Sequence, residues 1–286
     1  MKDILSIGEV LVDLKIIGGK MGLHTGGSAL NLSFYAEQAG AKVKFIGAIG
    51  NDFLAEHIEE ELKRLNFSQR PIRVDASTTL VLIKAEGEKL TPIIYRAADR
   101  MLSYEIIDAN WERAEIVHTS AFALSLEPAS TAILRALERA KEEGALISVD
   151  PNYRRKIWRT WGAGKEALLK AISMADIVKP SIEDAQELFG VKTPQEALDA
   201  FKLAGAKNII LSMGGRGVIA LTEENEIIKV PAKNVRVCEP TGAGDSLFGT
   251  ILAKFSKGWS LKEAIEEGVK VAAKVVSRPG TLVKVD

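Results

Sequence analysis

The chain has one cysteine, Cys238, among its 286 residues, so no disulfide can form within it. A chain of this length buries about three quarters of the surface that its unfolded form exposes, and it therefore needs no covalent cross-link to fold. The length allows one large domain or two small ones. We expect one folded unit, residues 1–286, in a reducing, cytoplasmic setting where thiols stay free.

The sequence also lacks an excess of charge of either sign, because 38 Lys and Arg residues balance 38 Asp and Glu residues. This balance argues against a protein whose main task is to bind nucleic acid or an anionic membrane. No stretch approaches the ~20 apolar residues of a membrane span, and no apolar run with a cleavage site predicts a secretory signal. We expect small-molecule partners, no nucleic acid and no membrane.

Histidine is scarce as well, and its positions do not suggest a metal site. The three histidines, His24, His57 and His118, are scattered along the chain, and no Cys or His residues stand at the spacing of metal ligands. Tetrahedral zinc sites need such clusters. We therefore expect no metal ion held by protein side chains.

Strand-like apolar runs alternate with helix-like segments along most of the chain. The first examples are Ile4–Gly8, Ser28–Gly40, Lys42–Ile49 and Phe53–Leu65. The same alternation continues through Ile116–Thr119, Ala129–Glu143, Ala145–Val149, Ala167–Met174, Ile177–Val178, Pro194–Ala204 and Asn208–Leu211, and the chain ends in two helical runs, Ala243–Lys257 and Leu261–Ser277. Short apolar strands separated by helices indicate βαβ units. The pattern predicts an α/β fold, a doubly wound and mostly parallel sheet flanked by helices.

Residues 71–96 break this rhythm. Two β-rich runs, Thr78–Ala85 and Thr91–Arg96, have no helix between them and predict a hairpin. Leu11–Ile17 alternates polar and apolar residues like a half-exposed strand. We predict that residues 11–17 and about 71–98 form a small β-sheet lid, because a sheet with one apolar face needs something to cover. An edge hairpin without motion is the alternative, and a homodimer through the lid is left open.

The strongest local motif is Gly242-Ala243-Gly244-Asp245, which leads directly into a helical run. Amides at a helix N-terminus carry unpaired N–H groups and partial positive charge, and these suit a phosphate. A carboxylate beside an anion hole makes sense if Asp245 takes a proton from a hydroxyl while the amides stabilise a phosphoryl group in transfer. Helix capping is the alternative role of Asp245. No Walker A sequence occurs.

A second glycine-rich helix start lies near the N-terminus, at Thr25–Asn31. Gly26 and Gly27 would let a polyhydroxy ligand approach the backbone, and Asn31 offers both a donor and an acceptor. The alternative is a turn with Ser28 as an N-cap. A serine-hydrolase nucleophile elbow is disfavoured because Leu30 stands where that motif requires glycine.

Together these motifs resemble the PfkB (ribokinase-like) carbohydrate kinases. Further segments in the same order support the resemblance over nearly the whole chain: Ile7–Glu9 with Asp13, Gly47–Asp52, Ala175–Pro180 and Leu211–Gly217. The resemblance implies a doubly wound α/β body with a small β lid. It also implies transfer of the γ-phosphoryl group of ATP to a sugar hydroxyl, with Mg²⁺ bridging the nucleotide phosphates; a monovalent-cation requirement is left open.

The resemblance also implies roles for single residues. Asp245 matches the catalytic base, and Gly242, Ala243 and Gly244 match the anion hole. Asp13, Gly27 and Asn31, with Gly26 beside them, match positions that hold sugar hydroxyls. The implied nucleotide-binding residues are Lys179, Asp184, Ser212, Gly214 and Gly217, together with Gly242 and Gly244. One departure is Ser181-Ile182-Glu183-Asp184, where the family often has an Asn-x-x-Glu associated with Mg²⁺ and phosphate.

The segment Val149–Arg154, with Trp158 shortly after it, is similar to the fructokinase and 2-keto-3-deoxygluconate kinase branch. Asn152 and Arg154 can face the same side of the cleft, and Arg96 ends the second lid strand. We therefore expect Arg96, Asn152 and Arg154 to bind the acceptor, which we predict to be fructose or a similar ketohexose. The alternatives are the keto acid, then ribose or a nucleoside, and outside catalysis a sugar- or nucleotide-sensing pseudokinase.

Overall fold

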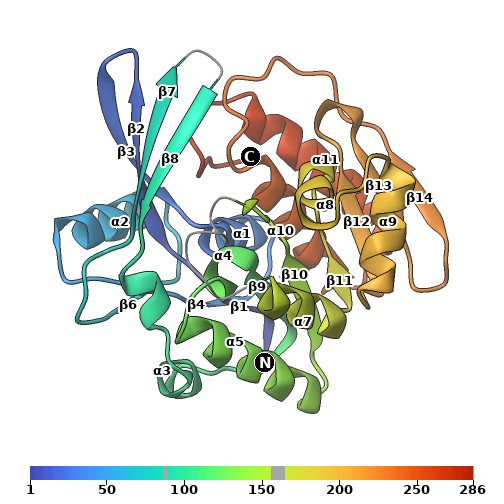
Figure 1. Ribbon diagram of the computed structural model, residues 1–286, viewed down its shortest axis with the longest axis horizontal. Coiled ribbons are helices and arrows are strands. Elements are labelled where there is room, and N and C mark those ends of the chain that lie inside the picture. The colour runs from blue at the N-terminus through green and yellow to red at the C-terminus, as the bar shows by residue number, and fades with distance from the viewer. Residues whose placement is uncertain (87–88, 156–164, 286) are drawn as a thin grey trace.

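The central sheet of the computed structural model, which describes residues 1–86, 89–155 and 165–285, has eight strands in the order β14-β13-β12-β11-β10-β9-β1-β4 (Figure 1). Their bounds are β1 (Lys2–Ile7), β4 (Val43–Ile46), β9 (Ala114–Ser120), β10 (Leu146–Asp150), β11 (Ile177–Val178), β12 (Asn208–Ser212), β13 (Val218–Leu221) and β14 (Ile227–Val230). The neighbouring strands from β4 to β12 in this order pair in parallel. β13 pairs antiparallel with β12, and β14 pairs antiparallel with β13. The predicted α/β fold is confirmed.

Helices cover both faces of this sheet (Figure 1). One core contains residues of α3 (Tyr104–Ala109), α4 (Ala121–Leu124), α5 (Ala129–Glu142), α7 (Glu166–Met174), α8 (Ile182–Phe189) and α9 (Pro194–Leu203). A second core contains residues of α1 (Ser28–Gln38), α10 (Ala243–Phe255) and α11 (Leu261–Val276), and a third lies between α1 and α2 (Phe53–Arg64). No helix in the described part of the chain is both long and apolar enough to cross a membrane.

A second sheet projects from the body, with the strand order β3-β2-β7-β8 (Figure 1). It contains β2 (Leu11–Ile17), β3 (Lys20–Gly26), β7 (Leu80–Glu86) and β8 (Lys89–Tyr95). We call this sheet the lid. The predicted hairpin and the predicted strand at Leu11–Ile17 are both present, and β2 pairs with β7 in parallel.

The lid differs from the prediction in two places. β3 was not predicted, although it pairs with β2 along its whole length. Residues 72 and 73 lie outside the lid, because β6 (Ile72–Arg73) pairs with β5 (Ala48–Ile49) in a separate two-stranded sheet. The predicted strand Lys42–Ile49 is therefore split at Gly47, where the chain leaves the main sheet.

Helices α1 and α10 pack against each other unusually closely. A Cβ atom at Gly249 of α10 would lie only 2.5 Å from the backbone oxygen of Leu32 in α1, so glycine is required there. The two helices lie side by side near the centre of the molecule (Figure 1). Their packing brings together two helix starts that are more than 200 residues apart in the sequence.

Candidate active site

The first turn of α10 carries the predicted anion hole and base. Gly242 is its N-cap with a φ of 86°, a left-handed conformation that favours glycine. Among the described residues no side chain caps this helix start. The amides of Gly242, Ala243 and Gly244 therefore begin a helix that has no side-chain cap, and the acidic residue in its first turn is Asp245.

Asp245 receives two side-chain hydrogen bonds, both from the start of α1. Ser28 Oγ donates to Asp245 Oδ1 at 2.8 Å, and Asn31 Nδ2 donates to Asp245 Oδ2 at 2.8 Å. Burial raises the pKa of Asp245, while Lys179 and the donors Asn31 and Ser28 oppose that rise. Asn31 Oδ1 is buried and has no partner among the described residues, so it is an acceptor left for a hydroxyl.

Glu9 holds the start of α1, a contact that sequence reasoning missed. Its Oε1 accepts from the backbone N–H of Ser28 at 2.6 Å, and its Oε2 accepts from Ser120 Oγ at 2.5 Å. Burial raises the pKa of Glu9 to about 7, against the hydrogen bonds that it accepts and the charge of Arg96. A carboxylate at a helix N-terminus also complements the helix dipole. Glu9 thus fixes the residue that in turn contacts the base.

The lid contributes Asp13 and Lys15 from the same face of β2. Asp13 Oδ2 would lie 3.0 Å from a Cβ at Gly26, so Gly26 gives this carboxylate its space. Burial raises the pKa of Asp13 to about 6, with Lys15 opposing the rise and Glu239 adding to it. Lys15 Nζ lies 3.4 Å from Glu239 Oε2, which links the lid to the loop before α10.

The structure gives Arg96 many protein partners. Its side chain is 0% exposed; Nε donates to Asp99 Oδ2 at 2.7 Å and Nη1 donates to Ser125 Oγ at 2.7 Å. Nη2 donates to the backbone oxygen of Phe122, whose ring lies under the guanidinium. In this arrangement Arg96 ties the end of β8 to α4, and a sugar contact by Arg96 stays a prediction.

Two further predicted acceptor residues follow β10. Asn152 has a positive φ of 29°, and its backbone N–H donates to Asp150 Oδ1 at 3.2 Å. Arg154 Nη1 lies 2.6 Å from Asp184 Oδ1, with half of the arginine side chain exposed. Arg154 therefore lies beside the predicted nucleotide residue Asp184, whereas the contact of Asn152 is to Asp150.

The predicted nucleotide-binding residues lie at strand ends and at the turns and helix starts that follow them. Asp184 Oδ2 accepts from the backbone N–H of Ser181, and Ser181 Oγ accepts from the backbone N–H of Asp184. This capping box starts α8. Ser212 ends β12 beside Ser181, and Gly214 and Gly217 follow it in a short 3₁₀ turn with positive φ at both glycines.

Lys179 is buried at the end of β11, and its Nζ lies 2.8 Å from Asp150 Oδ2. Asp150 was not among the predicted site residues. The signal that could have found it is its place at the end of a buried strand, because side chains at the carboxyl ends of neighbouring parallel strands meet at one edge of the sheet.

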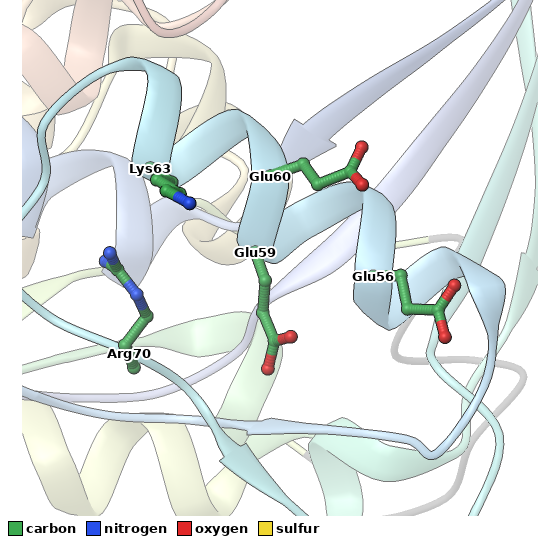
Figure 2. Close-up of a pocket in the computed structure, with 5 residues that line it drawn as sticks. All are labelled: Glu56, Glu59, Glu60, Lys63 and Arg70. Atoms are coloured by element: carbon green, nitrogen blue, oxygen red, sulfur yellow. The ribbon is translucent and has the colours of Figure 1, made fainter.

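A surface hollow on α2 (Phe53–Arg64) contains none of the predicted site residues. Its lining side chains are Glu56, Glu59, Glu60, Lys63 and Arg70 (Figure 2). Figure 2 shows the three glutamates and Lys63 projecting from the helix, with Arg70 on the segment that follows. Glu59 is engaged by Arg73. The hollow is an ordinary charged helix face and carries no functional assignment.

A buried carboxylate between two glycine-rich helix starts, on an α/β body with a projecting β lid, is an arrangement suited to transferring a phosphoryl group to an alcohol. Residues 1–286 match the model of the pfkB family carbohydrate kinases. The chain belongs to this family and is an ATP-dependent carbohydrate kinase.

Characterised relatives differ in their acceptors. The chain is 32% identical over 290 residues to the ATP-dependent 6-phosphofructokinase of Thermoanaerobacterium thermosaccharolyticum, covering 98% of this chain and 90% of that protein. It is 27% identical to the fructokinase of Vibrio alginolyticus, covering 81% and 76% of the two chains. In fold it matches the ATP-bound fructokinase of Xylella fastidiosa, with a TM-score of 0.87, 23% identity and coverage of 98% and 94%.

Proposed function

We propose that the enzyme is a fructokinase, which transfers the γ-phosphoryl group of ATP to a hydroxyl of fructose or a similar ketohexose. The observation that supports it most is the position of Asp245. Asp245 is the third residue of α10, and its carboxylate accepts hydrogen bonds from Ser28 and Asn31 of α1. A base in that position has the anion hole on one side and a polar helix start suited to sugar hydroxyls on the other.

In the proposed reaction the acceptor hydroxyl donates its proton to Asp245. The hydroxyl oxygen forms a bond to the γ-phosphorus, the bond from that phosphorus to the bridging oxygen of ADP breaks, and ADP leaves. Gly242, Ala243 and Gly244 present backbone amides to the charge on the group in transfer. Asn31 orients both partners, because its Nδ2 binds the base and its Oδ1 is left for the sugar.

Mg²⁺ would be held mainly through the phosphates of ATP, which it prefers as hard oxygen ligands. The carboxylate at the start of α8 agrees with this arrangement, because hydrogen bonds already occupy both of its oxygens. Asp184 already has a donor on each oxygen, Arg154 on Oδ1 and the Ser181 amide on Oδ2. The chemistry that the ion supplies when bound is neutralisation of the phosphate charge.

Charge pairing around the acceptor side favours a neutral sugar over an anionic one. The cations described there each have a carboxylate partner: Lys15 with Glu239, Arg96 with Asp99, and Arg154 with Asp184. A phosphate or carboxylate on the acceptor would have to share these cations with carboxylates that are already paired to them, and repulsion between the like charges disfavours it. Fructose 6-phosphate is the second candidate, because the relative with 32% identity is named a 6-phosphofructokinase.

An ADP-release assay across a panel of acceptors tests this proposal. The panel contains fructose, fructose 6-phosphate, 2-keto-3-deoxygluconate, ribose and adenosine, each with ATP and Mg²⁺. We expect the highest kcat/KM with fructose. A thousandfold preference for either anionic acceptor would reverse the choice, and ATP binding without ADP release on any sugar would indicate a pseudokinase.

We also propose that the enzyme forms a homodimer through the outer face of the lid. This face points away from Asp13 and Lys15, and it carries Met21, Ile93 and Tyr95, which are 73%, 49% and 56% exposed. Apolar side chains gathered on one exposed sheet face are typical of a protein–protein contact. A second copy offers the same apolar face and so would cover it with twofold symmetry.

A further inference from the structure

Lys179 and Asp150 form a buried ion pair at the ends of two neighbouring strands. Val149 of β10 is in register with Val178 of β11, so Asp150, the last residue of β10, lies beside Lys179, which directly follows β11. Lys179 Nζ lies 2.8 Å from Asp150 Oδ2, and the two side chains are 5% and 2% exposed. Such a pair is costly to bury and calls for a role beyond simple stability.

The ammonium group of this pair lies against the first turn of α10. A Cβ at Gly244 would lie 2.9 Å from Lys179 Nζ, so a larger residue at 244 would collide with the lysine. Lys179 Nζ also lies 6.0 Å from the centre of the Phe248 ring in the same helix. Lys179 therefore contacts the helix start that carries Asp245 from the buried side.

The titratable and charged groups around Asp245 come from several of the elements packed against this helix start. They are Lys179, Asp150, Asp184 with its partner Arg154, His118 of β9 and Tyr35 of α1. Burial lowers the pKa of His118 to about 3, with Lys179 adding to the effect, so this ring is neutral in the working range. Lys179 is the cation whose charge lowers the pKa of Asp245, against the rise that burial causes.

Asp150 moderates the field of that cation. Although burial disfavours the charged form of Lys179, Asp150, Asp245 and Asp184 raise its pKa, so it stays an ammonium. Burial raises the pKa of Asp150 to about 6 against the pull of Lys179. Loss of the Asp150 charge would strengthen the field of Lys179 at Asp245, and loss of Lys179 would remove it.

We propose that Lys179 and Asp150 are a positioning pair for the base: the buried ammonium favours the ionised form of Asp245 and seats the first turn of α10, and Asp150 fixes the place of that ammonium. The proposal rests on the proposed function, because it gives Asp245 the role of base. It assigns Lys179 a part different from the nucleotide contact predicted from the sequence.

The test is the pH dependence of kcat/KM for Lys179→Met and Asp150→Asn. The acid limb of this profile reports the pKa of the base in the free enzyme. We expect the limb to move up by about one pH unit in Lys179→Met and down in Asp150→Asn, because a nearby cation lowers a carboxyl pKa by about that much or more. Lys207→Met is the matched control, since Lys207 makes a similar 2.8 Å pair with Asp176 at the surface.

Two further measurements keep the proposal falsifiable. A single buried charge without its partner can prevent folding, so the double variant Lys179→Met/Asp150→Asn is made as well. Its acid limb should lie between those of the two single variants. An acid limb unchanged from the wild type in both Lys179→Met and the double variant, with ATP binding weakened in calorimetry without sugar, would make Lys179 a nucleotide ligand and overturn the proposal.

An acceptor-independent readout separates this proposal from the proposed function. The carboxyl carbon of Asp245, assigned by its loss in Asp245→Asn, is titrated by NMR in the enzyme without ligands. Opposite shifts of its pKa in Lys179→Met and Asp150→Asn support the pair even if fructose proves not to be the acceptor. Equal titration in the wild type and both variants overturns the pair even if fructose is phosphorylated.

Discussion

Asn31 Nδ2 lies 2.8 Å from Asp245 Oδ2, although 214 residues separate the two in the sequence. The contact joins the starts of α1 and α10, the two glycine-rich motifs of the chain. The Nδ2 group of Asn31 donates to the predicted base, and its buried Oδ1 has no partner among the described residues and can accept from a ligand. A change at either residue is therefore expected to affect sugar binding and proton transfer together.

Asp245→Asn should lower kcat with fructose by about 10²–10⁴-fold, the usual contribution of a positioned acid–base group. ATP binding, measured by calorimetry without sugar, should change little because the amides of α10 remain. Asp199→Asn, at an exposed position on α9, is the control. Near-normal turnover of Asp245→Asn with every sugar would refute its role as the base.

Glu9→Gln should change how stability depends on pH. The carboxyl of Glu9 has a pKa of about 7 in the folded protein against an ordinary value of 4.5, so the native state holds a proton that the unfolded state has lost between these values. Glu9 therefore lowers stability as the pH rises through this window, by up to about 3 kcal/mol. Urea unfolding at pH 5, 6, 7 and 8 measures the effect.

In Glu9→Gln this part of the pH dependence should vanish. The unfolding free energy of the wild type minus that of the variant should therefore fall as the pH rises. A constant difference from pH 5 to pH 8 would show that Glu9 titrates as it does in the unfolded chain. Glu37→Gln, which removes a carboxylate near the exposed end of α1, is the control.

Lys15→Met should raise KM for the sugar by about two- to fivefold with a smaller effect on kcat, because it removes the Lys15–Glu239 link between the lid and the loop before α10. Hydrogen exchange gives the structural readout. Sugar should slow exchange in β7 and β8 of the wild type, and less so in the variant. Lys20→Met, at an exposed position of β3, should behave like the wild type; equal protection in all three proteins would argue against a closing lid.

Tyr95→Glu should disrupt the proposed dimer, because it places a charge on the exposed outer face of the lid. Light scattering after gel filtration measures the mass of the wild type and the variant. We expect a dimer and a monomer respectively. Leu203→Glu, at an apolar position of α9 that is 90% exposed and far from the lid, is the control, and a monomeric wild type would end the dimer proposal.

The sequence predicts those parts of the site that consist of a few adjacent residues. Asp245 and Gly242–Gly244 follow from a glycine-rich helix start, and Asn31 from a second one, because capping and helix dipoles depend on a few adjacent residues. The lid hairpin follows from a break in the βαβ rhythm. These features were predicted without knowledge of the neighbours that pack on them.

The parts that were missed depend on tertiary packing. Glu9 and Asp150 are single acidic residues at strand ends, and only the assembled sheet shows that they contact Ser28 and Lys179. β3 contains Gly22 and lacks a strong alternating pattern, so its pairing with β2 decides its conformation. Arg96 was predicted from the family at the sugar, whereas its described partners depend on how η1 (Ala98–Met101) and α4 fold around it.

The parallel pairing of β2 with β7 has a consequence for how the molecule assembles. Parallel neighbours need a long crossover, and here the intervening chain includes α1, β4 and α2 of the body. The lid is therefore not an independent hairpin, and we expect it to form late in folding, since contacts between distant segments form slowly. The sheet that carries Asp13 would then be completed only after the body that supports it.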